Sequence, residues 1–200
     1  MLFRSPPLTE ILLARHGETD WNRENRFQGH ADPPLNEVGR AQSAELAATL
    51  AHEPIAAVYS SPLRRALETA ETVAARHELA PITVEALREV DVGSWEGLTR
   101  AQVETRFPEQ FRRWLDYGPG WEDGETHEQM GERVLAALGE LAHRHPHERI
   151  LVVTHGGPIR AALARAEGIP HNQARRTGPA LGNCFVAGVA VVDGDFRRID

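Results

Sequence analysis

The stretch ILLARHGETDWN, residues 11–22, places an arginine, a histidine and a glycine directly after four uninterrupted apolar residues. Residues 11–14 are too few for a helix and show no polar alternation, which predicts a buried strand of a parallel sheet. Gly17 allows the backbone to turn where this strand ends. Arg15 and His16 are therefore expected at the carboxyl end of a buried strand, where open α/β sheets bind ligands. Taken alone, the stretch is equally compatible with the start of a surface loop.

Two later segments repeat this arrangement. Residues 55–59 predict a second apolar strand, which is followed by SSPLRR at residues 60–65. In that segment Ser61 is a suitable helix cap and Pro62 suits the first helical position, so an arginine is again expected near a strand end. Spacing alone does not decide whether Arg64 or Arg65 points into a cleft.

The third segment, residues 149–160 (RILVVTHGGPIR), resembles the first more closely. A buried strand is followed by His155, then by Gly156 and Gly157 at the start of a predicted helix. A helix N-terminus favours an anion. Because the carboxyl ends of parallel strands meet at one edge of a sheet, two histidines and at least two arginines are expected to converge there.

This set of residues predicts a site for a phosphoryl group, because the planar fork of arginine matches phosphate oxygens. The sequence contains no P-loop or His-Glu-x-x-His pattern, so neither a metal nor a cofactor is expected. A covalent route through histidine is then favoured. The alternative is that both histidines only cap strands in the core, and two matched units plus the arginine pair argue against it.

The composition is that of one globular domain spanning residues 1–200, with 41% apolar and 26% charged residues. A net charge of −7 argues against general binding to nucleic acid or to a membrane surface. The single cysteine, Cys184, allows no intrachain disulfide and fits a reducing compartment. Residues 1–7 lack a signal-peptide pattern and no apolar run is long enough to cross a membrane, so a cytoplasmic location is expected.

The remaining patterns predict the elements around the site. Residues 20–34 predict a long functional loop, Asn36 a helix cap, and Thr99 and Thr126 the capping boxes of two further helices. Residues 98–125 are expected to form an irregular, aromatic, lid-like insertion. Residues 184–192 and 196–199 predict two strands joined by an Asp-Gly hairpin turn.

The sequence also resembles the histidine phosphatase, or phosphoglycerate mutase-like, superfamily, and within it the shorter phosphatase branch. The motifs that carry the resemblance occur in the family's order: LARHGETDWN (13–22), NRFQG (25–29), PLNEVGRAQ (34–42), SSPLRRA (60–66), LRE (87–89), GSWEG (93–97) and VVTHG (152–156). The tripeptide Arg-His-Gly alone is a weak signal, whereas the ordered set is very specific. The resemblance implies an α/β fold, a three-layer α/β/α sandwich with a mostly parallel central sheet.

The resemblance also implies a role for each site residue. His16 is the expected nucleophile, and Glu89 is the expected general acid and then general base. The phosphoryl oxygens are expected to contact Arg15, Arg65 and His155, assisted by Asn22, Gln28, Gly29 and Gly156. Arg65 is preferred over Arg64 because it immediately precedes Ala66. From chemistry alone, Asp91 and Glu96 are equal rivals of Glu89, which is expected in a partly apolar setting.

The expected activity is hydrolysis of small phosphomonoesters through a phosphohistidine. A cofactor-dependent phosphoglycerate mutase is the main alternative, but the chain lacks the Lys-Tyr-Tyr-Gly-type signature and has instead Gly124-Glu125-Thr126. A phosphatase acting on phosphotyrosine or phosphothreonine in proteins and a non-catalytic phosphate-binding module are further alternatives. The only expected partner is a small phosphorylated substrate, and the chain is expected to be a monomer or a homodimer.

Overall fold

The computed structural model describes residues 8–199, so the expectation for residues 1–7 lies outside it. Its centre is a six-stranded sheet with the order β3-β2-β4-β1-β5-β6. The strands are β1 (Leu8–Arg15), β2 (Ile55–Ser60), β3 (Ile82–Thr83), β4 (Arg149–Thr154), β5 (Val186–Val192) and β6 (Asp195–Ile199). The first four strands in this order pair in parallel, and β5 pairs antiparallel with both of its neighbours, β1 and β6. The mostly parallel sheet is therefore confirmed.

The central strands β1 and β4 are apolar on both faces because each face has its own core. Ile11 and Leu13 of β1 belong to one core cluster, while Ala14 belongs to the other. The same alternation occurs in β4, with Ile150 on one face and Leu151 on the other. Continuous apolar runs are what a strand buried on both faces requires.

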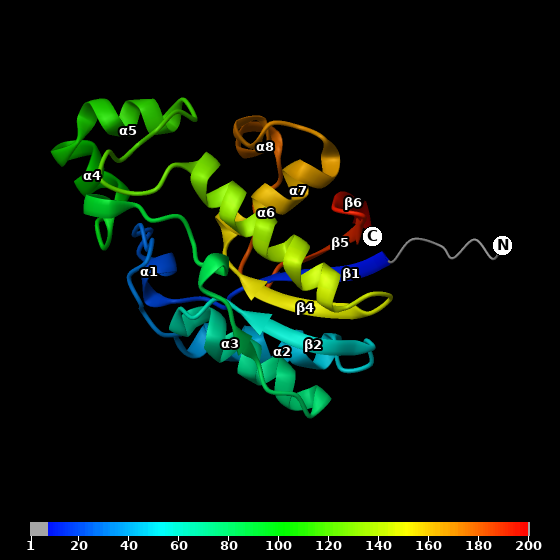
Figure 1. Cartoon of the computed structure of the whole chain (residues 1–200). Helices are drawn as coiled ribbons and strands as arrows, with labels where there is room; N and C mark the ends of the chain where they lie inside the picture. The colour runs from blue at the N-terminus through cyan, green and yellow to red at the C-terminus, as the bar shows by residue number, and fades with distance from the viewer. Residues whose placement is uncertain (1–7, 200) are drawn as a thin grey trace.

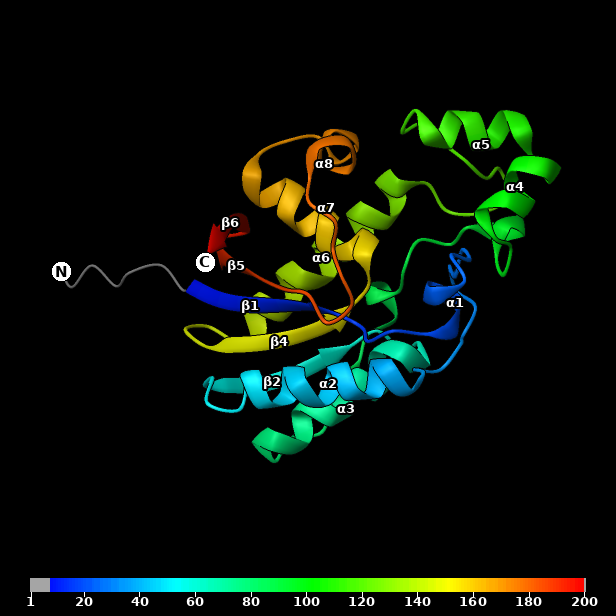
Figure 2. The same ribbon diagram turned by 180° about the vertical axis from the view of Figure 1, so that it is seen from behind.

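Helices cover both faces of the sheet. Figure 1 shows α2 (Glu37–Thr49) and α3 (Arg64–Ala74) on one face, and Figure 2 shows the same pair from behind. The other face is covered by α6 (His127–Arg144) and α7 (Gly156–Glu167), with α8 (His171–Thr177) packed against α7. The three-layer α/β/α arrangement is thus confirmed. Within residues 8–199, no helix has the length and apolar character needed to cross a bilayer.

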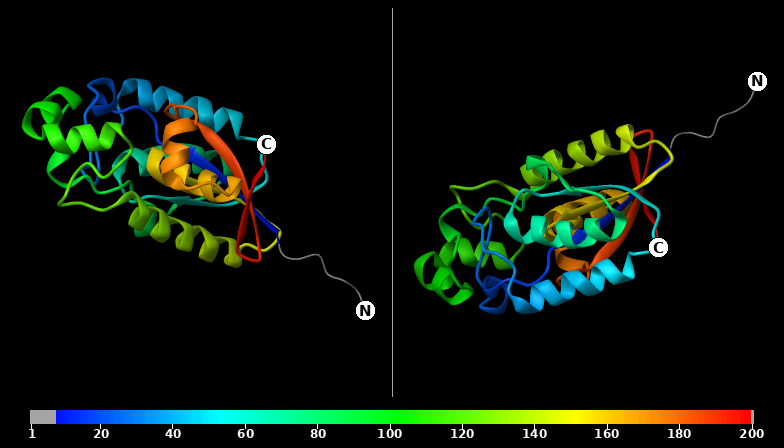
Figure 3. Two further views of the ribbon diagram at one scale, coloured as in Figure 1. Left: turned by 90° about the horizontal axis from the view of Figure 1, so that it is seen from above. Right: turned by 90° about the horizontal axis from the view of Figure 1, so that it is seen from below.

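Three short helices lie beyond the carboxyl ends of the parallel strands: α1 (Asp20–Arg23), α4 (Arg100–Arg106) and α5 (Pro108–Leu115) (Figure 3). The capping box at Thr99 predicted α4, whereas no pattern predicted α5, so the expectation of an irregular segment over residues 98–125 is wrong for α5. Thr99 is the N-cap residue of α4 and forms a capping box, and Pro108 is the first residue of α5. The Phe111 and Trp114 rings of α5 pack against the Trp95 ring with centroids 6.3 and 6.2 Å apart, which anchors this helix by aromatic packing.

The start of α3 differs from the sequence prediction. The helix begins at Arg64 with Leu63 as its N-cap residue, so Ser61 is no helix cap and Pro62 lies outside the helix. Instead, the Asp32 carboxylate accepts the Arg64 backbone N–H at 2.6 Å. This contact comes from the long loop after α1, and no pattern within residues 60–65 could indicate it.

The chain ends in the predicted hairpin, although β5 starts two residues later than expected. Asp193 and Gly194 both have positive φ, which is the turn geometry that matches the twist of a hairpin. Cys184 also has positive φ and precedes β5, with its N–H donated to the His16 carbonyl at 3.3 Å. Burial raises the pKa of its thiol to about 11, which argues against a catalytic thiolate.

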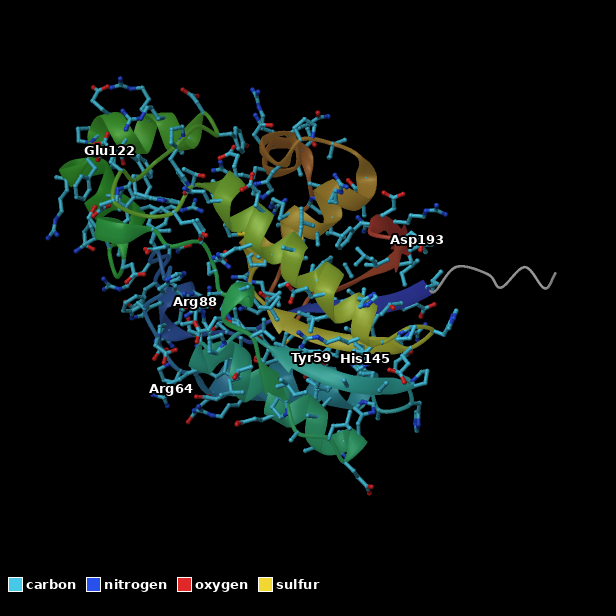
Figure 4. All side chains as sticks on the ribbon, viewed as in Figure 1. Tyr59, Arg64, Arg88, Glu122, His145 and Asp193 are labelled. Atoms are coloured by element: carbon cyan, nitrogen blue, oxygen red, sulfur yellow. The ribbon has the colours of Figure 1, made fainter. Side chains whose placement is uncertain are left out.

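Short 3₁₀ helices complete the described structure at Ala75–His77, Glu85–Leu87 and Gly93–Trp95. A polar contact ties β2 to the end of α6, where Tyr59 and His145 lie side by side (Figure 4). The His145 Nδ1 proton is donated to Glu148 at 2.6 Å, so His145 Nε2 accepts the Tyr59 hydroxyl proton at 2.8 Å.

Candidate active site

His16 extends the β1 ladder by one residue at the carboxyl edge of the sheet. Its backbone N–H is donated to the Thr154 carbonyl at 3.0 Å, and its own carbonyl accepts the Asn183 side-chain amide at 3.0 Å. The imidazole is 3% exposed, and its Nδ1 lies 2.7 Å from the Gly17 carbonyl. A carbonyl can only accept, so Nδ1 carries the proton and Nε2 keeps its lone pair.

Gly17 makes this position possible because α2 packs closely against the turn. A Cβ atom on Gly17 would lie 2.5 Å from the Gly39 carbonyl oxygen, so no larger residue fits without moving α2. The Gly17 N–H is donated to Thr69 of α3 at 3.0 Å. The turn after β1 is thus held by both helices of one face, which orients the His16 ring.

His155 follows β4 and stands beside His16, with the two ring centroids 5.2 Å apart. It is fully buried, and its Nε2 lies 2.8 Å from the Ser61 hydroxyl. Because that hydroxyl already accepts the Leu63 N–H at 3.4 Å, it can donate its proton to Nε2 and leave the imidazole proton on Nδ1. His155 Nδ1 is buried and has no partner among residues 8–199.

Two arginines face the histidines. Arg65 is completely buried, and its two terminal nitrogens donate to the Ala31 and Gly29 carbonyls at 2.7 and 2.9 Å. Arg15 donates one terminal nitrogen to the Leu181 carbonyl. Arg64, by contrast, is exposed near the periphery of the molecule and contacts Glu68 at 3.6 Å (Figure 4). The choice of Arg65, which spacing left open, therefore agrees with its position.

The surroundings of the histidines keep both imidazoles neutral. Burial is the main cause that lowers the pKa of His16 well below its usual value, and the charges of Arg65 and Arg15 lower it further. Burial and the Arg65 charge likewise lower the pKa of His155. Burial also lowers the pKa of Arg65 to about 10, which still leaves the guanidinium charged at neutral pH.

Glu89 lies opposite the histidines at the N-terminus of α7. Its carboxylate accepts the Gly157 N–H at 3.2 and 3.3 Å and the Val90 N–H at 3.0 Å. A Cβ on Gly157 would lie 2.3 Å from Glu89 Oε1, so glycine is needed for this approach. The anion at the α7 N-terminus is thus this carboxylate. Its setting is polar and close to arginines, which corrects the expected partly apolar setting.

The two rival carboxylates have structural contacts instead. Glu96 accepts the backbone N–H groups of His30 and Ala31 at 2.5 and 3.1 Å, which braces the loop whose carbonyls hold Arg65. Asp91 accepts the Gly93 N–H at 2.9 Å. Neither residue lines the cleft beside the histidines, whereas Glu89 does.

All the predicted site residues except His155, which is fully buried beside His16, line one cleft of about 390 Å³, a size suited to a small metabolite. Of the predicted residues, Arg15, His16, Asn22, Gln28, Gly29, Arg65, Glu89 and Gly156 line it. The Asn22 Oδ1 atom accepts the Thr19 N–H at 3.1 Å and the Asn183 amide at 3.3 Å, which fixes the side chain. Gly29 contributes its carbonyl to Arg65, so its contact with a phosphoryl group stays a prediction.

Sequence patterns missed several residues of the site. Arg133 of α6 donates to the Ala86, Arg88 and Glu89 carbonyls, each at 2.8 Å, and forms a two-pronged ion pair with Glu125. It therefore clamps the backbone that carries Glu89. The other missed residues lie farther along the cleft: Arg100, Trp114, Trp121, His127, Arg160, His171 and Arg175. Arg160 had a local signal, one helical turn after Gly156, and Arg100, Trp114 and Trp121 fall in residues 98–125, which the sequence predicted to be an aromatic lid.

Comparison with known proteins shows the family to which this chain belongs. The family described as the histidine phosphatase superfamily (branch 1) matches residues 11–198, so the chain belongs to that superfamily. It is similar to phosphoserine phosphatase 1 of Hydrogenobacter thermophilus, with 35% identity over 81% of this chain and 78% of the relative. A metal-independent phosphoserine phosphatase of Arabidopsis thaliana is 40% identical over 79% of this chain and 68% of the relative.

A solved structure of Bacillus stearothermophilus YhfR superposes with a TM-score of 0.88 at 34% identity and covers 95% of both chains. The fold resemblance inferred from the ordered motifs is therefore confirmed. The protein is a phosphatase of the histidine phosphatase class, a hydrolase of small phosphate esters.

Proposed function

We propose that His16 Nε2 attacks the phosphorus of a small phosphomonoester and forms a phosphohistidine. The new N–P bond replaces the ester P–O bond, and the protonated form of Glu89 gives its proton to the leaving alcohol oxygen. Glu89 then takes a proton from water, whose oxygen attacks phosphorus and breaks the N–P bond. Inorganic phosphate leaves and His16 returns to its starting state.

One observation carries this proposal. Three buried donors beside His16 have no partner among residues 8–199: Arg15 Nε, Arg65 Nε and His155 Nδ1. A buried donor left unpaired costs about 1–3 kcal/mol, so three at one point indicate a missing acceptor. A phosphoryl group has the oxygens and the negative charge to accept from all three, and its charge is greatest in the transition state.

The substrate panel that tests this function pairs phosphate release with a mutase assay. We expect release of inorganic phosphate from small esters such as O-phosphoserine, the substrate named for two of the relatives. The panel also includes α-ribazole phosphate, sugar phosphates and phosphopeptides. Interconversion of 3- and 2-phosphoglycerate with 2,3-bisphosphoglycerate that outpaces phosphate release would make the protein a mutase instead. Binding without turnover would make it a non-catalytic module.

Activity is expected to survive removal of divalent cations. The charge that neutralises the phosphoryl group comes from Arg15 and Arg65, and no group of three His, Cys, Asp or Glu side chains within residues 8–199 is placed to hold a metal. Phosphate release in excess EDTA should stay within about twofold of the untreated rate, because the expected mechanism uses no metal ion. Loss of activity that only a divalent ion restores contradicts the prediction.

We further propose that the protein works in the cytoplasm. This is supported by a single free cysteine and by the small phosphorylated metabolites on which the class acts.

A further inference from the structure

The cleft continues past the catalytic residues to a second polar end, which the proposed function does not use. Four residues form this end, here called the distal subsite: His127 of α6, Arg160 of α7, and His171 and Arg175 of α8. The His127 and His171 rings have centroids 5.5 Å apart, and Trp121 packs against His127 at 5.4 Å. The subsite therefore combines two imidazoles, two guanidinium groups and one aromatic wall.

The two arginines carry positive charge without a carboxylate partner. Arg160 donates to the Ala174 and Pro179 carbonyls at 3.0 and 3.2 Å, and Arg175 donates to the Tyr117 carbonyl at 3.0 Å. Among the ion pairs of residues 8–199, neither guanidinium takes part. Glu128 is the acidic residue whose charge acts most strongly on Arg175, but Glu128 is exposed and does not line the cleft.

The two imidazoles have unused hydrogen-bonding capacity. All four ring nitrogens of His127 and His171 are buried and lack a partner within the described residues. Burial and the charge of Arg175 lower the pKa of His127 to about 3 and that of His171 to about 4. Each ring is therefore neutral at physiological pH and offers one N–H donor and one acceptor. Buried polar atoms of this kind indicate a polar ligand at this end.

Arg160 connects the distal subsite to the catalytic end. Its charge acts on His171, while the Glu89 carboxylate acts on the Arg160 guanidinium. Because both ends line one cleft of about 390 Å³, a single small molecule can reach from one to the other.

We propose that the distal subsite binds a second anionic group of the substrate, a carboxylate or a second phosphate, whose oxygens accept from Arg160, Arg175 and the imidazole N–H groups. This proposal rests on the proposed phosphatase function and narrows its substrates to phosphomonoesters that carry a further anion. Unpaired arginine forks suit such groups because they bind both oxygens of a carboxylate or phosphate. The arginines thereby discriminate against simple monoesters of neutral alcohols.

The test compares esters that differ only in the second anion. O-Phosphoserine is matched with O-phosphoethanolamine, which lacks the carboxylate, and propane-1,3-diol bisphosphate is matched with its monophosphate. We expect kcat/KM to favour the dianionic member of at least one pair by about 10- to 100-fold, the value of a charge-assisted contact. The pair that shows the preference identifies the carboxylate or the phosphate as the ligand.

Arg175→Gln should remove most of that preference by raising KM for the favoured ester, while kcat changes little. The matched control is Arg176→Gln, because Arg176 also lies over the Tyr117 ring, at 5.5 Å, but is exposed and does not line the cleft. Arg175→Lys, which keeps the charge and loses the fork, should retain part of the preference and remains informative if the glutamine variant misfolds.

Two outcomes would overturn the inference. One is equal kcat/KM for both members of each pair in the unaltered protein. The other is an equal change for both members in folded Arg175→Gln. Failure of the proposed function itself is distinguishable, because the unaltered protein would then release phosphate from neither member of any pair.

Discussion

His16→Ala is expected to abolish turnover and to prevent any labelling of the protein by phosphosubstrate. The variant removes His16 Nε2, the proposed nucleophile. The ring that carries this atom is neutral, and its Nδ1 lies 2.7 Å from the Gly17 carbonyl, which fixes the orientation of the ring. Arg15, Arg65 and His155 would remain, so the substrate should still bind. Loss of a covalent nucleophile from an assembled site lowers kcat by on the order of 10⁴-fold or more.

The measurement is a rapid quench in alkaline denaturant after mixing with ³²P-labelled ester, followed by localisation of the label. A phosphohistidine is acid-labile and stable to base, so its label should appear on the unaltered protein and be absent from His16→Ala. His143→Ala is the matched control, because His143 is exposed on α6 and far from the cleft lining. Full activity of His16→Ala, or a label that persists on it, would remove His16 from the mechanism.

Glu89→Gln is expected to lower kcat by about 10²- to 10⁴-fold with an alkyl phosphate, the usual contribution of a general acid or base. Glutamine keeps the size of the side chain and an oxygen that can accept the Gly157 N–H, so the local fold should persist. It has no proton to give to an alkoxide leaving group and cannot take one from water. Both chemical steps therefore slow.

The leaving group separates these two steps. p-Nitrophenolate needs little protonation, so Glu89→Gln should still be phosphorylated by p-nitrophenyl phosphate and then stall before hydrolysis. The expected result is a burst of about one equivalent of p-nitrophenolate and a phosphoenzyme that persists, since the intermediate accumulates when its breakdown is slow. Asp91→Asn is the control, because Asp91 is nearby but does not line the cleft. Equal losses in the two variants would contradict the assignment.

The strands and their polar ends follow from local sequence. Residues 11–14 and 150–153 are apolar without interruption because both faces of their strands are covered, and the structure shows this in two separate core clusters. Parallel pairing then brings Arg15 next to Thr154, which places His16 and His155 at one edge. The capping boxes at Thr99 and Thr126 were equally local, and both helices form where they were predicted.

Where the prediction failed, a contact distant in sequence was responsible. Ser61 was expected to cap α3, but its hydroxyl is used by His155, which is 94 residues away in the chain. The polar setting of Glu89 arises from Gly157, 68 residues later, and the clamp on its backbone comes from Arg133. Patterns within a short window contain no information about such partners.

By itself, therefore, the sequence determined the strands, the turn at Gly17, and the presence of histidines and arginines at the strand ends, because these depend on residues close to one another. Only the tertiary structure decided that Arg65 is buried and Arg64 exposed, since successive residues of a helix face different directions. It also decided that three unpaired donors meet beside His16, and that α6, α7 and α8 close the cleft with the distal subsite. These arrangements depend on how separate elements pack, which local patterns do not specify.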